Sequence, residues 1–263
     1  MESGLKTTIK SGTARRAPTG FTLIELVVVI VIVGILSALG GQFIVAPVRG
    51  YVDLSRRAKL VDQAEMALRR MQRDIRHALP NSIPAVNDAL SLTMEVSIDG
   101  GRYRRYPGPG FNDTLKFNTT DDSFEMLGAP NNGILERLAA GIPLDMVVYN
   151  TSPADTGNRQ GVASIDPVAP HIVTLMSPWQ FPQPSPQQRF YILERNDSSV
   201  TYTCDGSTLT RNGDLVTRNV IDCKFTYNPG ATQRAGLVTL KLTLEEAEEE
   251  ITLLHQVHVV NAP

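Results

Sequence analysis

Cysteine is nearly absent from this sequence, which has two cysteines among its 263 residues. So low a count excludes a disulfide-rich scaffold, and the lack of any CxxC pair excludes the common zinc-binding motifs. Walker loops, nucleophile elbows and glycine-rich dinucleotide fingerprints are also missing. These absences argue against an enzyme, and we expect no catalytic site, no bound metal and no cofactor.

A surplus of either charge is missing as well. The formal net charge is −2 and hydrophobic residues make up 42% of the chain, which matches neither a typical nucleic-acid-binding domain nor a disordered chain. Residues 102–106, RYRRY, interleave basic and aromatic side chains, a pattern that can stack on single-stranded nucleic acid. The other interpretation is an exposed strand, and because no larger basic field surrounds the motif we expect no nucleic-acid partner.

Charge is completely missing between Leu26 and Val48. In a helix these residues rise by about 1.5 Å each, which is enough to cross the roughly 30 Å hydrocarbon core of a bilayer. The preceding segment has one acidic residue, Glu2, and the basic residues Lys6, Lys10, Arg15 and Arg16. Because an excess of Lys and Arg keeps its side of a first span in the cytoplasm, we expect everything after the span to lie outside the inner membrane.

Two export signals offer other interpretations of this N-terminus. A secretory signal would use Arg15 and Arg16 as its charged start and residues 38–40, ALG, as its cleavage site. Against this, Glu25 interrupts the start of the apolar core, and the helical pattern continues past the supposed cut. A twin-arginine signal is disfavoured because residues 17–20, APTG, lack the usual continuation.

Residues 20–26, GFTLIEL, resemble the processing site of type IV pilins and of the pseudopilins of type II secretion. The resemblance implies that a prepilin peptidase cuts after Gly20 and methylates the new N-terminal residue, Phe21. It also implies that Glu25 attracts the amino terminus of a neighbouring subunit during assembly. A carboxylate costs about 2.5 to 3.5 kcal/mol at a bilayer centre, and the ammonium of a processed neighbour is a cation that would offset this cost.

Residues 51–79 have the period of an amphipathic helix. Apolar side chains recur every three or four positions and would share one face. They are Leu60, Ala64, Leu68, Met71, Ile75 and Leu79. We expect Pro80 to end this helix, and Pro47 and the glycines at residues 40–41 to weaken or kink the helix before it.

The other faces of this predicted helix carry many charged residues. Several acidic and basic residues fall three or four positions apart, as Glu65 and Arg69 do, and this spacing predicts a solvated face that also includes Asp74. The alternative is a basic patch that packs against another subunit.

After Pro80 the sequence changes to short strands and turns. Residues 92–98 alternate apolar and polar side chains, and residues 99–101, DGG, predict a hairpin turn. Further strands are predicted at residues 115–117, 146–149, 172–176, 190–193, 200–204, 207–211, 220–227, 238–244 and 251–260. No second long amphipathic helix is predicted. Loops are predicted at residues 128–133 and 151–170, at the proline-rich, surface-exposed residues 178–186, and at the solvated hairpin of residues 245–250, EEAEEE.

Cys204 and Cys223 are expected to form a disulfide, because both lie on predicted neighbouring strands in a part of the chain placed outside the cytoplasm. Two buried free thiols are the alternative. His255 and His258 are three residues apart, which places them on opposite faces of a strand and predicts structural histidines, not a shared metal site.

The rest of the chain extends the resemblance. Residues 71–82, MQRDIRHALPNS, resemble the helix end of large minor pilins and of a minor pseudopilin of type II secretion. Residues 253–263, LLHQVHVVNAP, together with the preceding cysteine pair, are similar to minor pilins of the mannose-sensitive haemagglutinin (MSHA) pilus. The resemblance implies a pilin-like α+β fold, in which a long N-terminal helix, first membrane-spanning and then amphipathic, precedes an antiparallel β-rich globular head. The implied parts are a leader at residues 1–20, a transmembrane and assembly helix at 21–48, its amphipathic continuation at 49–79 and a periplasmic head at 80–263.

The same resemblance implies a subunit that is stored in the inner membrane and then built into a surface pilus, at or near the tip, where it primes assembly. Its implied partners are a prepilin peptidase, other major and minor pilins, the inner-membrane assembly platform and, before assembly, the lipid bilayer. Two alternatives stay open. One is a minor pseudopilin of a type II secretion system, and the other is a membrane-anchored adhesin or DNA-uptake binding module.

Overall fold

The computed structural model describes residues 20–108, 110, 113–230 and 235–259. The basic residues of the predicted leader and the last residues of the C-terminal motif lie outside these ranges. The chain divides into two compact units, Met1–Asp53 and Leu54–Pro263, and each is described by itself below.

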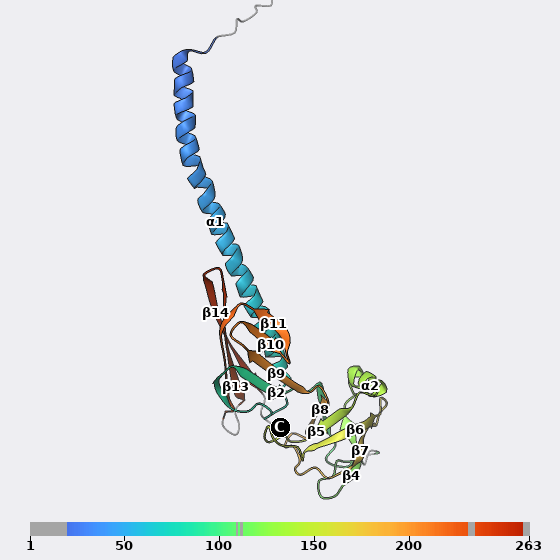
Figure 1. Ribbon diagram of the computed structural model, residues 1–263. Helices are drawn as coiled ribbons and strands as arrows, with labels where there is room; N and C mark the ends of the chain where they lie inside the picture. The colour runs from blue at the N-terminus through green and yellow to red at the C-terminus, as the bar shows by residue number, and fades with distance from the viewer. Residues whose placement is uncertain (1–19, 109, 111–112, 231–234, 260–263) are drawn as a thin grey trace, which may run out of the picture. The chain divides into compact units, whose positions relative to one another are not determined.

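The longest element is helix α1, Leu23–Arg76, which has 54 residues and is unbroken through Pro47 (Figure 1). In the second unit its apolar face is fully buried, which confirms the predicted amphipathic helix. The buried side chains are Leu60, Ala64, Leu68, Met71 and Ile75. The helix ends at Arg76, earlier than predicted, because Ala78 pairs with Val96 in a β-bridge and the Leu79 N–H donates to the carbonyl of Glu95.

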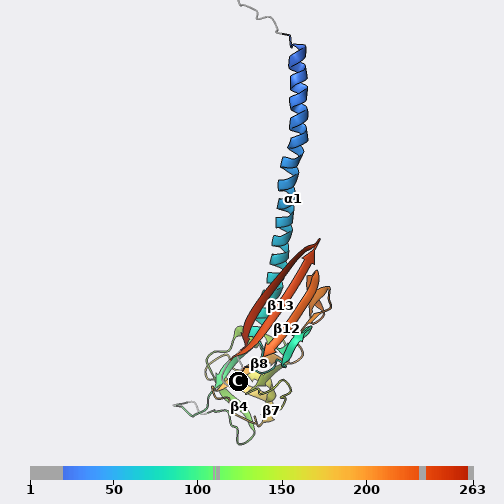
Figure 2. The same ribbon diagram turned by 90° about the vertical axis from the view of Figure 1, so that its left-hand side faces the viewer.

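The second unit contains two lobes. In the first, here called the sandwich lobe, two four-stranded antiparallel sheets pack with α1 around one core (Figure 2). The first sheet has the order β1-β12-β13-β14, with β1 Val86–Ala89, β12 Val220–Asn228, β13 Gly236–Glu246 and β14 Glu249–Val259. The second has the order β11-β10-β9-β2, with β2 Ser91–Glu95, β9 Ser199–Cys204, β10 Thr208–Arg211 and β11 Asp214–Arg218. Their inner faces bury large side chains, including Tyr202, Phe225 and Leu240.

The second lobe, here called the barrel lobe, is a closed six-stranded barrel with the order β3-β4-β7-β6-β5-β8. Its strands are β3 Asp99–Tyr103, β4 Asp121–Leu127, β5 Leu144–Val147, β6 Arg159–Ile165, β7 His171–Trp179 and β8 Arg189–Glu194. A short helix, α2 Asn132–Ala139, lies between β4 and β5. The aromatic rings of Phe124 and Phe190 meet edge to face in the core, 5.6 Å apart.

The whole barrel is inserted between two strands that pair directly with each other. β2 leads into the barrel and β9 leaves it, yet the two are antiparallel neighbours with Glu95 opposite Ser199. The lobes contact each other through a buried apolar cluster of Leu79, Val147 and Leu193. Beside it the Asn150 side chain donates to the carbonyl of Pro80 at 2.8 Å.

The predicted fold class is correct at its coarse level and wrong in detail. An N-terminal apolar helix is followed by a β-rich head with antiparallel sheets, as expected. The strongly β head with its six-stranded barrel departs from the α+β fold that is typical of pilins. The pattern of short strands indicated β structure, but it did not show that six of the strands close on themselves.

Residues 99–101 form the start of β3, so the predicted hairpin turn there is wrong. The two glycines serve close packing, because a Cβ on Gly100 would lie 2.8 Å from the carbonyl oxygen of Phe190. A Cβ on Gly101 would lie 2.7 Å from the ring of the same phenylalanine. Glycine within a strand often marks such a close approach.

Several other elements differ from the prediction. Residues 115–117 form no strand, while α2 and β6 lie at or within predicted loops and β1, β4 and β11 were not predicted. The start of α2 depends on one side chain, since Asn131 accepts a hydrogen bond from the Gly133 N–H at 2.9 Å. In the proline-rich segment 178–186, predicted to be exposed, Phe181 is fully buried in the barrel core.

Candidate functional site: helix start, charged helix face and disulfide

The start of α1 is fixed by a local capping interaction. The Glu25 N–H donates to the Thr22 hydroxyl at 3.3 Å, and the Leu26 N–H donates to the Thr22 carbonyl at 3.2 Å. Thr22 and Glu25 have the spacing of a capping box, and a carboxylate in the first turn interacts favourably with the positive end of the helix dipole. Glu25 therefore also stabilises the start of the helix, a role that was not predicted. The threonine three residues earlier was the signal in the sequence for this role.

The Gly20–Phe21 peptide bond lies just before the helix. Both residues are exposed, Phe21 to 81%, and a Cβ on Gly20 would have no atom within 4 Å. Exposed backbone outside a helix or strand, next to a residue without a side chain, lets a protease approach closely, as the predicted cleavage requires.

The helix continues as an apolar span without any cover. Leu23–Gly40 is an 18-residue stretch with a mean hydropathy of 2.8, and none of it is buried. Length and composition allow this stretch to cross a membrane. A helix that is apolar on every side needs an apolar environment, which is lipid or other helices.

The N-terminal sequence matches a known family description, the prokaryotic N-terminal methylation motif, over residues 15–40. Comparison of the whole chain with curated proteins and with solved structures finds no match. The motif defines a prepilin-type N-terminus and implies processing by a prepilin peptidase followed by pilin assembly. It supports a type IV pilin-like family for the chain, and its combination with a single N-terminal apolar helix fits a membrane-anchored pilin.

The charged face of α1 was predicted to be solvated, but at Asp74 this prediction is wrong. Asp74 accepts hydrogen bonds from the Tyr202 hydroxyl at 2.8 Å and from Nε of Arg211 at 2.7 Å. Burial, together with the bond to Asp74, raises the pKa of Tyr202. These bonds tie the helix to β9 and β10, and residues so far apart in the sequence gave no sign of their contact.

Replacing Asp74 with Ala should lower the free energy of unfolding of the head by about 2 to 3 kcal/mol, because it leaves Tyr202 and Arg211 without their acceptor. Urea unfolding of residues 54–263 measures the change. The matched control is Glu65→Ala, which removes only the exposed ion pair with Arg69 and should cost less than about 0.5 kcal/mol. Equal losses in the two variants would contradict the anchoring role of Asp74.

The acidic run 245–250 is a hairpin, as predicted, but only part of it is solvated. Ala247 and Glu248 form its two-residue turn with positive φ angles of 51° and 69°. Glu249 binds Arg57 of α1 at 3.1 Å, and Glu246 binds Lys59 at 3.4 Å. Two carboxylates of the run therefore hold the β13–β14 hairpin against the helix.

Two residues of the basic and aromatic motif at residues 102–106 contact the barrel lobe, while Arg105 and Tyr106 are exposed, with the Arg105 guanidinium 5.7 Å from the centre of the Tyr106 ring. Tyr103 is fully buried and its hydroxyl donates to the Ser185 carbonyl at 3.3 Å, while burial raises its pKa. Arg104 forms a double hydrogen bond with Glu125, in which Nη2 lies 2.9 Å from Oε1. These two residues serve the barrel lobe.

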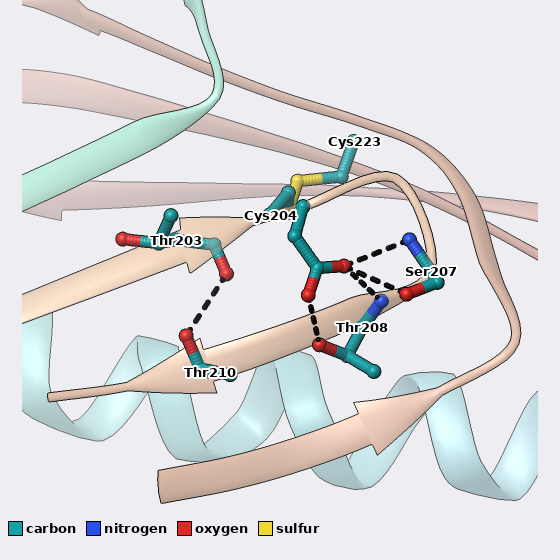
Figure 3. The surroundings of a disulfide bond; sticks show 7 residues. Thr203, Cys204, Ser207, Thr208, Thr210 and Cys223 are labelled. Atoms are coloured by element: carbon teal, nitrogen blue, oxygen red, sulfur yellow. Dashed lines mark hydrogen bonds between the residues drawn. A yellow bond between two sulfur atoms is a disulfide. The ribbon is translucent and has the colours of Figure 1, made fainter. Parts of the chain in front are cut away.

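The predicted disulfide is present, although the two strands that it joins are not neighbours. Cys204 belongs to β9 and Cys223 to β12, so the bond links the two sheets of the sandwich lobe across a Cα–Cα distance of 6.4 Å (Figure 3). Both cysteines are buried. Next to Cys204, the carboxylate of Asp205 accepts the N–H groups of Thr208 and Ser207, which lower its pKa and fix the turn into β10.

Removing this disulfide by replacing both cysteines with Ala should lower the free energy of unfolding of the head by about 3 kcal/mol, because the unfolded chain regains the freedom of a loop of roughly 20 residues. Urea unfolding with and without a thiol reductant provides the internal control. Reductant should destabilise the natural head and leave the Cys204→Ala, Cys223→Ala variant unchanged. Equal stability of the two oxidised proteins would contradict a stabilising disulfide.

The remaining predicted site residues are not brought together. His255 and His258 project from opposite faces of β14, as predicted, with His255 half-buried and His258 exposed. Within the part of the chain that the structure describes, no group of three or more His, Cys, Asp or Glu side chains has a metal-binding arrangement.

Proposed function

We propose that this chain is a minor pilin of a type IV pilus of the MSHA type, similar to MshO, that is incorporated at or near the tip and primes pilus assembly. In this proposal a prepilin peptidase cuts after Gly20 and methylates Phe21, and Glu25 pairs with the amino terminus of a neighbouring subunit. The protein acts by assembly and has no catalytic activity.

The observation that carries the proposal is the coincidence of three features at one point of the chain. The methylation motif covers residues 15–40, the cleavable Gly20–Phe21 bond is exposed, and an uncovered apolar helix begins directly after it. The proposed topology places the N-terminus in the cytoplasm and the head in the periplasm. A disulfide in the head supports that placement, because disulfides persist in oxidising compartments.

Mass spectrometry of the protein isolated from membranes tests the proposed processing. We expect a mature chain that begins with N-methylated Phe21, and a Gly20→Val variant that stays as a longer precursor and runs as a slower band on a gel. Gly34→Ala, a change of glycine inside the helix, serves as the control and should be processed normally. A mature chain that begins elsewhere, for example after residue 40, would show that the N-terminus is an ordinary export signal.

A pseudopilin of type II secretion shares the same motif and is the nearest alternative. Purification of the assembled partners distinguishes the two, because the proposal requires pilus subunits, and recovery of secretion-system subunits instead would overturn it.

A further inference from the structure

A groove between α1 and β11 carries positive charge that is only partly compensated. Its volume is about 670 Å³, and it is lined by Arg69, Arg70 and Arg73 around apolar side chains that include Met66 and Val216. No carboxylate is among the lining residues. Arg69 binds Glu65 at 3.1 Å, whereas Arg70 and Arg73 form no ion pair with any residue that the structure describes.

The tip of the β13–β14 hairpin carries a surplus of negative charge. Glu245 lies directly opposite Glu250, and Glu246 lies opposite Glu249. Like charges facing each other across two strands are destabilising, and for the inner pair, Glu246 and Glu249, the cations of α1 offset this repulsion.

The repulsion between Glu245 and Glu250, here called the outer pair, is not offset by any cation in the described part of α1. Glu245 and Glu250 are exposed, as is Glu248 in the turn, and none of the three has an ion pair within residues 20–108, 110, 113–230 and 235–259. Lys241 is hydrogen-bonded to Asp222, which raises the pKa of Lys241 first, and the charge of Glu250 contributes least to that rise. The hairpin tip, defined as residues 245–250, is therefore an exposed anionic surface.

The β13–β14 hairpin and the β10–β11 hairpin lie as separate strands beside α1 (Figure 1). The tip of a chain binds Arg57 and Lys59 of its own helix, and no tip residue lines its own groove. We propose that the hairpin tip of one copy of this chain docks in the α1–β11 groove of a second copy, with its outer glutamates facing Arg70 and Arg73. Complementary charge steers and orients such a contact, and the apolar floor of the groove adds burial.

The contact joins two different surfaces, so it is heterologous and leaves a free tip and a free groove at the ends of each pair. Repetition of the contact would give an open row in which each copy is displaced along the helix relative to the next, because the tip lies beside Arg57 and Lys59 and the groove at residues 63–73. The groove fits a short acidic segment better than nucleic acid, because its basic field is limited to three arginines on one helix in a chain of net charge −2. The inference goes beyond the proposed function and concerns any chains whose heads project from the same side of one membrane.

Disulfide cross-linking of the full chain in cell membranes tests this contact. One cysteine replaces Met66 in the groove and another replaces Ala247 in the tip; both natural residues are exposed, and the described natural cysteines are paired. On mild oxidation we expect the double variant to form a ladder of dimers, trimers and larger species on a non-reducing gel. Each single variant should form no species larger than a dimer.

Charge reversal in the same background shows whether the arginines and glutamates hold the contact. Arg70→Glu with Arg73→Glu should reduce the ladder about tenfold, and adding Glu245→Arg with Glu250→Arg should restore it. Arg76→Glu with Arg105→Glu makes the same change in net charge outside the groove and should leave the ladder intact.

A ladder that is insensitive to reversal of Arg70 and Arg73, or no ladder in the double cysteine variant, would overturn the inference. A ladder that disappears after nuclease treatment would also overturn it, by showing that nucleic acid bridges the heads. Mass spectrometry of the N-terminus from the same membranes reports separately on the proposed function. A chain with an unmethylated N-terminus and an intact ladder would reject the pilin proposal and keep the contact between copies.

Discussion

Replacing Glu25 with Val should leave membrane insertion and processing intact and reduce incorporation into the filament roughly thirtyfold, which corresponds to about 2 kcal/mol. The physical reason is the environment of the helix start. In the proposed assembly, the apolar stretch Leu23–Gly40 would move from lipid into a bundle of helices, where the N-terminal ammonium of a neighbouring subunit would lose its water. Without the carboxylate of Glu25 this ammonium has no partner in a medium of low dielectric constant.

The structure supplies the control that separates this role from helix capping. Thr22→Val removes the hydroxyl that accepts the Glu25 N–H but keeps the carboxylate, so it should weaken the start of the helix by about 1 kcal/mol and leave incorporation near normal. Quantification of the protein in sheared filaments, relative to the membrane pool, measures both variants. Equal incorporation of Glu25→Val and the natural chain would refute the assembly contact, and equal loss in both variants would assign the effect to the cap.

Local periodicity was sufficient to predict which faces of helix α1 and strand β14 are buried. The spacing of Leu60, Leu68 and Ile75 defined the inner face of α1, and the alternation along residues 251–260 placed His255 and His258 on opposite faces of β14. A repeat of 3.6 or 2 residues depends only on neighbours in the chain, so it can be read without knowing the rest of the fold. The GFTLIEL motif is local in the same sense.

Contacts between residues far apart in the sequence could not be predicted from local periodicity. Asp74 and Arg211 are 137 residues apart, and the sequence around Asp74 does not distinguish a carboxylate that meets solvent from one that binds a distant arginine. The prediction of a hairpin turn at Gly100 and Gly101 is wrong for a related reason. The residue that requires glycine at both positions, Phe190, lies on another strand. A pattern in one segment indicates which face is buried, but it does not identify the residues that pack against that face.

The barrel lobe shows the same limit on a larger scale. Its strands β4 and β6 have mixed burial patterns without clear alternation, and pairing of β2 with β9 bridges the entire insertion. Among the residues that the structure describes, the core of the sandwich lobe contains no residue of the barrel strands, and the barrel core contains no residue of α1 or of β9–β14. The two cores are therefore separate, and the sandwich lobe should not need the barrel in order to fold.

Excision of the barrel should consequently leave a folded sandwich lobe. Because Glu95 and Ser199 lie opposite each other, residues 96–198 can be replaced by Asn-Gly, a pair suited to a two-residue hairpin turn. Leu79, which the barrel covers with Val147 and Leu193, is changed to Ser in the same variant so that this large apolar side chain is not exposed to solvent. We expect a cooperative unfolding transition and a natural Cys204–Cys223 bond in the excised head, starting at Leu54.

The complementary fragment, residues 98–194, contains all six barrel strands and should also fold alone. Circular dichroism with thermal unfolding, together with resistance to limited proteolysis, measures both products against the intact head. The expected cost is small on each side, since the contacts between the described parts of the lobes are few: the Leu79 cluster, the hydrogen bonds of Asn150 with Pro80 and Asn81, and the Arg159–Glu95 ion pair are examples. Two unfolded fragments would mean that these few contacts dominate the stability of the head. Two folded fragments would mean that the barrel lobe is an independent folding unit inserted between β2 and β9 of the sandwich lobe. Its surface would then be available for contacts with other molecules without affecting the fold of the sandwich lobe.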